Sequence, residues 1–278
     1  MSDLTKDFGA SAPKAKAEPN RDNINLLLLS NGALAQKRNE TIQELFGASP
    51  ENPKTIMYVA YALGDQDAAL ARTKAWMEPL GINVISAHNQ ADPVAALAKV
   101  DGVFVTGGNT FRLLDKLQKT GLLEAIRDRA FEGFPYMGAS AAINVTGLTI
   151  MTTNDMPIVQ PRDMNAMGLV PFQINPHYVD GKFYYEEDGK VIPYAGESRA
   201  DRLNQYHEEN STPIIGVREG SALRVRGNTV ELLGGKPAHV FEQGKPNAIT
   251  TEDSVLTAFM TPAKPASPAA AAPQPPKP

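Results

Sequence analysis

Short apolar runs alternate with helix-like segments through the first half of the chain, and this alternation is the strongest constraint on its fold. Strand character occurs at residues 23–29, 55–60, 83–86 and 102–105, and in a further run that leads into Ser140. Helical spacing occurs up to residue 46 and at residues 65–77, 93–99, 111–119 and 122–132. Near-continuous apolar strands between helices are typical of sheets covered on both faces. The pattern therefore predicts an α/β fold with a mostly parallel sheet and helices on both faces.

The pattern changes after Ser140. It predicts a helix at residues 198–208, a strand at 214–217, and a terminal meander of strands at 223–225, 230–233 and 240–241. There is no internal repeat and no convincing linker, so we expect one domain over residues 24–260. Residues 1–23 are polar, and residues 261–278 are almost entirely Pro, Ala and Lys. Such compositions cannot bury a core, and we expect both segments to be disordered.

Composition excludes several classes of function. The net charge of −4 gives no electrostatic basis for binding nucleic acid or an anionic membrane. The absence of cysteine excludes disulfides, thiolate nucleophiles and cysteine-ligated metals. No apolar stretch approaches the roughly 20 residues of a membrane span, and the polar first residues do not resemble a secretory signal. We therefore expect a cytoplasmic protein without nucleic-acid or membrane partners.

A single serine stands where an apolar run meets a series of small residues. The segment Tyr136-Met-Gly-Ala-Ser140-Ala-Ala-Ile-Asn144 is typical of a strand–serine–helix turn that exposes the serine hydroxyl. Small neighbours are needed because such a turn leaves little room for side chains. Ala142 occupies a position that is usually glycine, and it is tolerated only if its backbone is helical. The alternative is a strand end that merely packs closely.

A glycine-rich turn follows the preceding strand, at Gly107-Gly108-Asn109. Ligands of open parallel sheets bind beyond the carboxyl ends of the strands, so this turn and Ser140 are expected at one edge. The backbone N–H groups of Gly108 and Ala141 are then candidate oxyanion donors for acyl transfer. Asn109 or Thr110 also suits a helix cap, and the two interpretations are compatible. The sequence lacks the glycine motifs of a phosphate-binding loop.

A serine nucleophile needs a base, and the chain contains four histidines. His177, in the turn after Asn175-Pro176, is the first candidate, and His88 at the end of a strand is the second. We expect His207 on the solvated face of a charged helix and His239 in the meander beyond the site. No cluster of residues has the spacing of a metal site, and we expect neither a metal nor a cofactor.

The third member of a catalytic triad would be an acid that orients the histidine. Asp155 lies in a polar turn between the serine and the histidine, and is the first candidate. Glu219, just after another apolar strand, is the second. The sequence alone does not choose between them.

Five segments together resemble the aspartyl dipeptidase (peptidase E) family of serine peptidases. They match the family motifs Gly-Gly-Asn-Thr-Phe-x-Leu-Leu, Gly-x-Ser-Ala-Gly-Ala-Asn, Thr-Thr-Asn-Asp-Met-Pro-Ile, Asn-Pro-His and Gly-Glu-Thr-Arg-x-x-Arg. The matching residues are 107–114, 138–144, 152–158, 175–177 and 196–202, in the family's order. The departures are Ala142 and Ile143 for Gly and Ala, and Ser198 for Thr.

The resemblance implies a flavodoxin-like, glutamine-amidotransferase-like fold and hydrolysis of dipeptides with an N-terminal aspartate (Asp-X). It implies Ser140 as nucleophile, His177 as base, and either Asp155 or Glu219 as the acid. Substrate binding is assigned to Arg199, a guanidinium suited to a carboxylate, and to Asn109.

Two other functions stay open at this point. One is a cyanophycinase-like β-aspartyl peptidase, because that family has a similar sheet and serine turn. The other is a catalytically inactive homologue that only binds aspartyl peptides, for which Ala142 is the support. The sequence leaves the oligomeric state open between a monomer and a homodimer.

Overall fold

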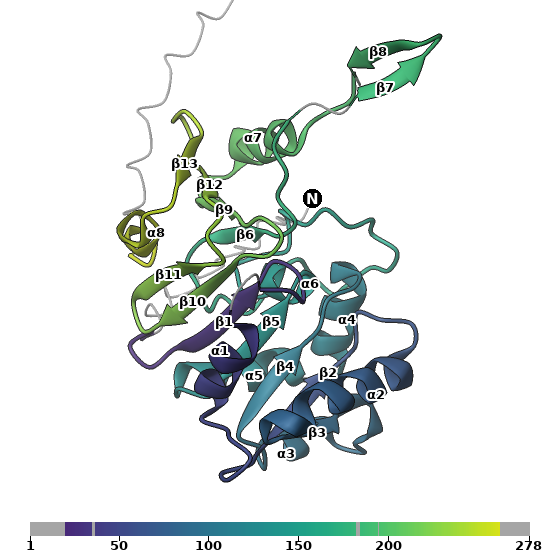
Figure 1. The fold of residues 1–278 in the computed structure, drawn as a ribbon, viewed down its shortest axis with the longest axis vertical. Coiled ribbons are helices and arrows are strands. Elements are labelled where there is room, and N and C mark those ends of the chain that lie inside the picture. The colour runs from purple at the N-terminus through teal and green to yellow at the C-terminus, as the bar shows by residue number, and fades with distance from the viewer. Residues whose placement is uncertain (1–19, 35–36, 182–183, 194, 262–278) are drawn as a thin grey trace, which may run out of the picture.

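The computed structural model describes residues 20–34, 37–181, 184–193 and 195–261. Its central element is a seven-stranded sheet in the order β11-β10-β1-β5-β4-β2-β3 (Figure 1). The strands of this sheet are β1 (Asn25–Leu29), β2 (Lys54–Val59), β3 (Ile82–Ser86), β4 (Gly102–Val105), β5 (Tyr136–Ala139), β10 (Ala222–Arg226) and β11 (Thr229–Leu233). Strands β1 to β5 are parallel to one another, whereas β10 is antiparallel to both β1 and β11. The predicted mostly parallel sheet is confirmed.

Helices cover both faces of this sheet, as predicted. They are α1 (Arg38–Phe46), α2 (Gln66–Met77), α3 (Pro93–Leu97), α4 (Thr110–Thr120), α5 (Leu122–Phe131) and α6 (Ala141–Asn144). Alternate residues of a strand point to opposite faces. Leu27 and Leu29 accordingly pack with α1 and α2, and Leu26 and Leu28 pack with α3 to α6. Short 3₁₀ helices at Glu78–Leu80 and Ala87–Asn89 flank β3.

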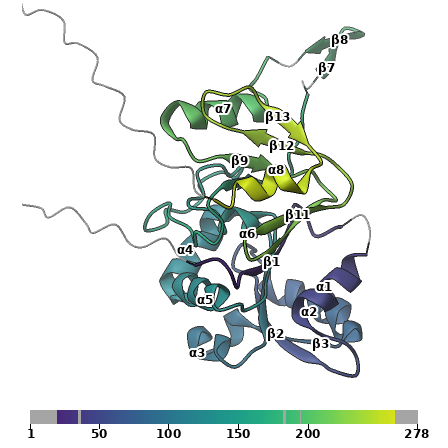
Figure 2. The same cartoon turned by 90° about the vertical axis from the view of Figure 1, so that its left-hand side faces the viewer.

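A second, smaller sheet has the order β13-β12-β9-β6. Its strands are β6 (Gln173–Asn175), β9 (Ile214–Gly216), β12 (Ala238–Phe241) and β13 (Ala248–Thr250), and helices α7 (Arg199–Glu209) and α8 (Asp253–Ala258) accompany it. Figure 2 shows it stacked beyond the end of the main sheet where the chain enters α6. The predicted terminal meander is therefore wrong in one respect. β10 and β11 extend the main sheet, whereas β12 pairs with β9.

The glycine pair after β11 explains this change of sheet. Gly234 and Gly235 have φ of 98° and 72°, a conformation that favours glycine. A Cβ on Gly234 would lie 2.2 Å from the carbonyl oxygen of Gly220, so no other residue fits. The chain thus turns sharply out of the main sheet and enters the second one.

A hairpin of β7 (Tyr184–Glu187) and β8 (Lys190–Pro193) projects from the body near α7 (Figures 1 and 2). Residues 1–19 and 262–278, where we expect disordered extensions, lie outside the described residues. Residues 20–23 are described, and buried Arg21 donates from Nε to the carbonyl of Leu169 (3.1 Å). No helix in the described ranges is long and apolar enough to cross a membrane.

The strand order indicates which edge of the main sheet is suited to bind a ligand. The chain leaves β2 toward β3 on one side and returns to β4 on the other, so the order reverses between β2 and β4. Ligands bind in open α/β sheets at such a reversal, beyond the carboxyl ends of the strands. The turns after β2, β4 and β5 all lie at this edge.

Tyr136, the first residue of β5, is fully buried, and its hydroxyl donates to the carbonyl oxygen of Ala142 in α6 (2.7 Å). Burial raises the pKa of this phenol far above its usual range, so it stays a neutral donor. Replacing Tyr136 with Phe is expected to lower the free energy of unfolding by about 1–3 kcal/mol, because a buried acceptor loses its partner. Urea denaturation measures this. The control Tyr185→Phe, on the exposed β7, is expected within about 0.5 kcal/mol of wild type. Equal stabilities of the two variants would contradict the assigned role of the hydrogen bond.

Candidate active site

Ser140 occupies a strained turn between β5 and α6. Its φ is 54° and its ψ is −116°, values that L-residues rarely adopt. Such strain costs about 1–3 kcal/mol and persists only where the surroundings impose it. Here the Ser140 N–H donates to the carbonyl of Leu29 at the end of β1 (3.0 Å), and its carbonyl accepts from Ile143 in α6 (2.8 Å).

The turn is crowded on both sides, which accounts for its small residues. A Cβ on Gly107 would lie 2.7 Å from Ser140 Cβ, and one on Gly138 would lie 2.8 Å from the ring of Tyr136. Ala142 belongs to helix α6 and is not among the residues with positive φ. Its backbone therefore meets the condition under which alanine is tolerated, and its methyl group packs into the core.

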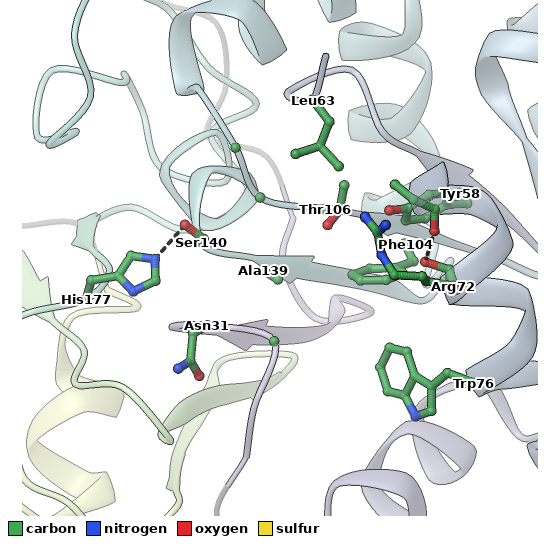
Figure 3. Close-up of a pocket in the computed structure, with 15 residues that line it drawn as sticks. Asn31, Tyr58, Leu63, Arg72, Trp76, Phe104, Thr106, Ala139, Ser140 and His177 are labelled. Atoms are coloured by element: carbon green, nitrogen blue, oxygen red, sulfur yellow. Dashed lines mark hydrogen bonds between the residues drawn. The ribbon is translucent and has the colours of Figure 1, made fainter. Parts of the chain in front are cut away.

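The predicted base meets the predicted nucleophile directly. Ser140 Oγ lies 2.7 Å from His177 Nε2, as Figure 3 shows. His177 follows the short strand β6 and itself has a positive φ of 53°. Its backbone N–H donates to Ser30 Oγ (2.8 Å), and that hydroxyl donates to the carbonyl of Val217 (2.8 Å). Ser30 thus ties the end of β1 to the two loops of the second sheet that flank the site.

Glu219, the second candidate, is the acid that contacts the histidine. Its Oε1 lies 2.9 Å from His177 Nδ1, and the Glu219 side chain is 63% exposed. A proton on Nδ1 then faces the carboxylate, and Nε2 is left to accept from the Ser140 hydroxyl. The order of hydrogen bonds from serine through histidine to acid is that of a catalytic triad.

Asp155, the first candidate for the acid, lies at the start of α4. Its Oδ2 accepts from the backbone N–H (2.7 Å) and the hydroxyl (2.6 Å) of Thr110, the first residue of α4. A carboxylate is stabilised at this position by the helix dipole and by the free N–H groups. Asp155 thus anchors the 150s loop to α4 and does not contact His177.

The turns after β4 and β5 bring the candidate oxyanion donors to the same edge. Gly108 has a φ of 139°, and a Cβ there would lie 2.6 Å from the carbonyl oxygen of Ala62, so the close approach requires glycine. The N–H of Ala141 is the first of helix α6 and has no acceptor within that helix. Neither N–H donates to any described residue, and both are available to a ligand.

Arg199 and Asn109, the two candidate substrate-binding residues, differ in how far their side chains are already hydrogen-bonded within the protein. Arg199 Nη1 makes only long contacts, to Asn175 Oδ1 (3.4 Å) and the carbonyl of Pro176 (3.5 Å). Partial burial, and the nearby charge of Arg202, lower the pKa of Arg199, while Asp155 opposes the shift. Asn109 is committed to structure: its Oδ1 accepts from Arg112 N (3.0 Å) as the cap of α4, and its Nδ2 donates to the carbonyl of Met156 (2.9 Å).

The other three histidines have partners of their own. His88 lies between Ser86 Oγ (2.6 Å) and Asp67 Oδ1 (2.9 Å) at the end of β3. The expected exposure of His207 is wrong: it is 8% exposed, its Nδ1 lies 2.9 Å from the carbonyl oxygen of Asn210, and Gln243 in the loop after β12 donates to the carbonyl of His207. His239 stacks on Tyr178 with a centroid distance of 4.3 Å, and burial together with Arg218 lowers its pKa. Among the described residues, no group of three or more His, Asp or Glu side chains could hold a metal ion.

Sequence reasoning missed a cavity of about 400 Å³ that opens beside Ser140 and His177 (Figure 3). Its wall includes Arg72, Trp76 and Tyr58, from α2 and β2. The reversal of strand order between β2 and β4 would have indicated this cavity. That reversal can be recognised only once the order of the strands in the sheet is known.

Comparison with known proteins places these features in a family. The sequence model described as peptidase family S51 matches residues 26–233. Peptidase E of Streptomyces coelicolor is 43% identical over 223 residues, which cover 80% of this chain and 88% of that protein. A probable alpha-aspartyl dipeptidase of Drosophila melanogaster is 40% identical over 225 residues, which cover 78% and 90%.

Two solved structures share the fold. A putative peptidase E protein from Listeria monocytogenes aligns with a TM-score of 0.56 at 24% identity, over 75% of this chain and 97% of that one. A peptidase from an acI-B1 actinobacterium aligns with a TM-score of 0.58 at 17% identity, over 83% and 96%. These likenesses agree with the expected flavodoxin-like architecture, and the family match confirms the resemblance seen in the five motifs. The chain belongs to peptidase family S51 and is a peptide-bond hydrolase.

Proposed function

We propose that this protein is a serine exopeptidase that hydrolyses Asp-X dipeptides, with Ser140 as nucleophile, His177 as base and Glu219 as the orienting acid. The observation that carries the proposal is the line of two hydrogen bonds, 2.7 Å and 2.9 Å long, that joins these three side chains. The names of the relatives support the substrate, since they include a peptidase E and a probable alpha-aspartyl dipeptidase. We also propose that it acts in the cytoplasm, on small peptides.

In the acylation step, Ser140 Oγ attacks the carbonyl carbon of the Asp-X bond while His177 Nε2 takes the hydroxyl proton. The carbonyl oxygen gains negative charge, which the N–H groups of Gly108 and Ala141 stabilise. The imidazolium then donates its proton to the amino group of X, which leaves, and the aspartyl group stays on Ser140 as an ester. A water deprotonated by the same histidine hydrolyses that ester.

Glu219 acts on the histidine and not on the substrate. Its carboxylate at Nδ1 fixes the tautomer and stabilises the imidazolium that forms in each step. Because Glu219 is 63% exposed, its charge is screened by water, and we assign it a role in orientation more than in a strong ion pair.

Arg199 is the proposed recognition residue for the substrate aspartate. Its guanidinium is half-buried, keeps its charge, and has no carboxylate within 4.0 Å among the described residues. A partly buried cation without an ion-pair partner gains from a ligand carboxylate that binds it in bidentate fashion. Asp155 is the proposed positioning residue of this region, since it holds the start of α4 and its charge acts on Arg199.

The two alternative functions predict different results. A cyanophycinase-like enzyme would cleave β-aspartyl-arginine in preference to α-aspartyl-arginine, and a direct comparison of these substrates separates the two activities. An inactive binding protein would bind Asp-X without turnover. The helical backbone of Ala142 removes the physical reason for expecting inactivity, because alanine fits that position without strain.

Replacing Ser140 with Ala is expected to lower kcat for Asp-Leu by about 10⁴-fold or more, because the nucleophile is lost. Release of leucine measures this, and retained binding of Asp-Leu by calorimetry shows that the variant is folded. Ser211→Ala, in an exposed loop, is the matched control and is expected to be fully active. Activity of Ser140→Ala equal to that of Ser211→Ala would remove Ser140 as the nucleophile.

Replacing Glu219 with Gln is expected to lower kcat for Asp-Leu by about 10²–10⁴-fold, because an amide in place of the acid favours the wrong histidine tautomer. Asp155→Asn is the comparison and is expected to change kcat by less than about tenfold, since it leaves the contacts of His177 intact. Steady-state kinetics at several pH values measures both. A larger loss of kcat in Asp155→Asn than in Glu219→Gln would assign the acid role to Asp155.

Replacing Arg199 with Met is expected to abolish the preference for Asp-Leu over Asn-Leu, with kcat/KM for Asp-Leu falling by about 10²-fold or more, because a charge-assisted contact is lost. Arg202→Met is the control, on the same helix and 59% exposed. An unchanged ratio of kcat/KM for the two dipeptides in Arg199→Met would show that the substrate carboxylate binds elsewhere.

A further inference from the structure

The cavity beside Ser140 leads away from the nucleophile along the sheet edge. Ser140 and His177 lie at one end, and Tyr58, Phe104 and Trp76 lie at the other (Figure 3). Its volume of about 400 Å³ falls in the range of small-molecule sites, which is about 300–1,000 Å³. It occupies the reversal point between β2 and β4, where open α/β sheets bind ligands.

The far end of the cavity is aromatic and held in place. The rings of Tyr58 and Phe104 are 5.3 Å apart, and Trp76 packs edge-on against Phe104 at 6.3 Å. Trp76 is fixed from the other side, because Arg38 lies 4.2 Å over its ring and its Nε1 donates to Asn39 (3.1 Å). Such a preorganised aromatic wall suits an apolar or aromatic side chain.

A single cation, among the described residues that line the cavity, stands at this aromatic end. Arg72 reaches in from α2 and lines the cavity together with Tyr58 and Thr106, in the part that Figure 3 shows away from His177. It has no ion pair or hydrogen bond with any described residue. The nearby carboxylate of Asp67, on the same helix, pairs with His88. Arg72 is thus available to an anionic group inside the cavity.

The cavity and the Arg199 region have no residue in common. Arg199, Asn175 and Asp155 form one polar cluster, and none of them lines the cavity. If Arg199 holds the aspartate, the acyl half of the substrate occupies that cluster. The leaving half must accept a proton from His177, and His177 lines the mouth of the cavity.

We propose that this cavity is the subsite for the leaving residue X, a proposal that rests on the Asp-X function above. The side chain of X packs against Tyr58, Phe104 and Trp76, and its α-carboxylate pairs with Arg72. The subsite then favours large apolar or aromatic X. It also favours the free carboxylate of a dipeptide, because an amide or a further residue cannot pair with the guanidinium in the same way.

The test compares Asp-Phe with Asp-Phe amide in wild type and in Arg72→Met. In wild type, kcat/KM is expected to be at least about tenfold higher for the free acid, as for one charge-assisted contact. In Arg72→Met that preference is expected to disappear through a higher KM for Asp-Phe, with the amide unchanged. Arg72→Lys restores part of the preference. Lys74→Met, two residues along α2 and outside the cavity lining, is the control and keeps the wild-type preference.

A turnover-independent measurement separates this proposal from the proposed function. Calorimetry is expected to show L-phenylalanine binding wild type at least about tenfold more tightly than L-phenylalaninamide, with the difference lost in Arg72→Met. Wild type that cleaves no Asp-X dipeptide but keeps this binding pattern would overturn the function and support the subsite. Equal losses for acid and amide in Arg72→Met, or no loss for either, would overturn the subsite.

Discussion

The close approach of the turns after β4 and β5 is the constraint on which the site depends. Gly107 leaves no space for a Cβ because Ser140 Cβ would lie 2.7 Å away, and Gly108 packs equally closely on the turn after β2. Three strand ends are thereby pressed together without side chains between them. This packing holds Ser140 at a φ of 54°, and it leaves the N–H groups of Gly108 and Ala141 as the polar groups nearest to the reacting carbonyl in the proposed mechanism. The strained backbone of Ser140 and the N–H groups that would stabilise a negative charge on the substrate therefore both follow from this close packing.

The loops of the second sheet carry the proposed base and the proposed acid. In the proposed mechanism, a nucleophile at the end of β5 needs a base that approaches from outside the main sheet, and His177 lies on the loop after β6. Ser30 connects the two sheets, because its hydroxyl accepts from the N–H of His177 and donates to the carbonyl of Val217, two residues before Glu219. One side chain at the end of β1 therefore connects the loops that carry His177 and Glu219, the proposed base and acid. Its complete burial keeps water from competing for these bonds.

Sequence reasoning succeeded where the signal was local and failed where it depended on distant packing. The parallel strands and their helices were predictable because each is a continuous apolar run or a periodic segment. The strands at β9 and β12 were predicted, but β6 and β13 are only three residues long, too short for a period to show, so the second sheet was not recognised. The β7–β8 hairpin is exposed except at half-buried Ile192 and lacks alternation, although its Asp188-Gly189 turn, with φ of 50° and 69°, is a typical hairpin signal. His207 lies four residues after buried Leu203, and this helical spacing outweighs the two glutamates that follow it.

The same difference between local signals and distant packing explains why the acid could not be chosen from the sequence. The sequence does not choose between Asp155, which stands in a polar turn, and Glu219, which follows an apolar strand. Only the fold separates them, by placing the 150s loop against the start of α4 and the loop after β9 against His177. Asp155 satisfies donors that the helix leaves free, and such a carboxylate is held too firmly to follow the imidazole. Glu219 is exposed and attached through a longer side chain, so it can remain hydrogen-bonded while the ring gains and loses its proton. In our proposal, an exposed acid that contacts His177 and an acid bound at the start of α4 are therefore complementary parts of one site.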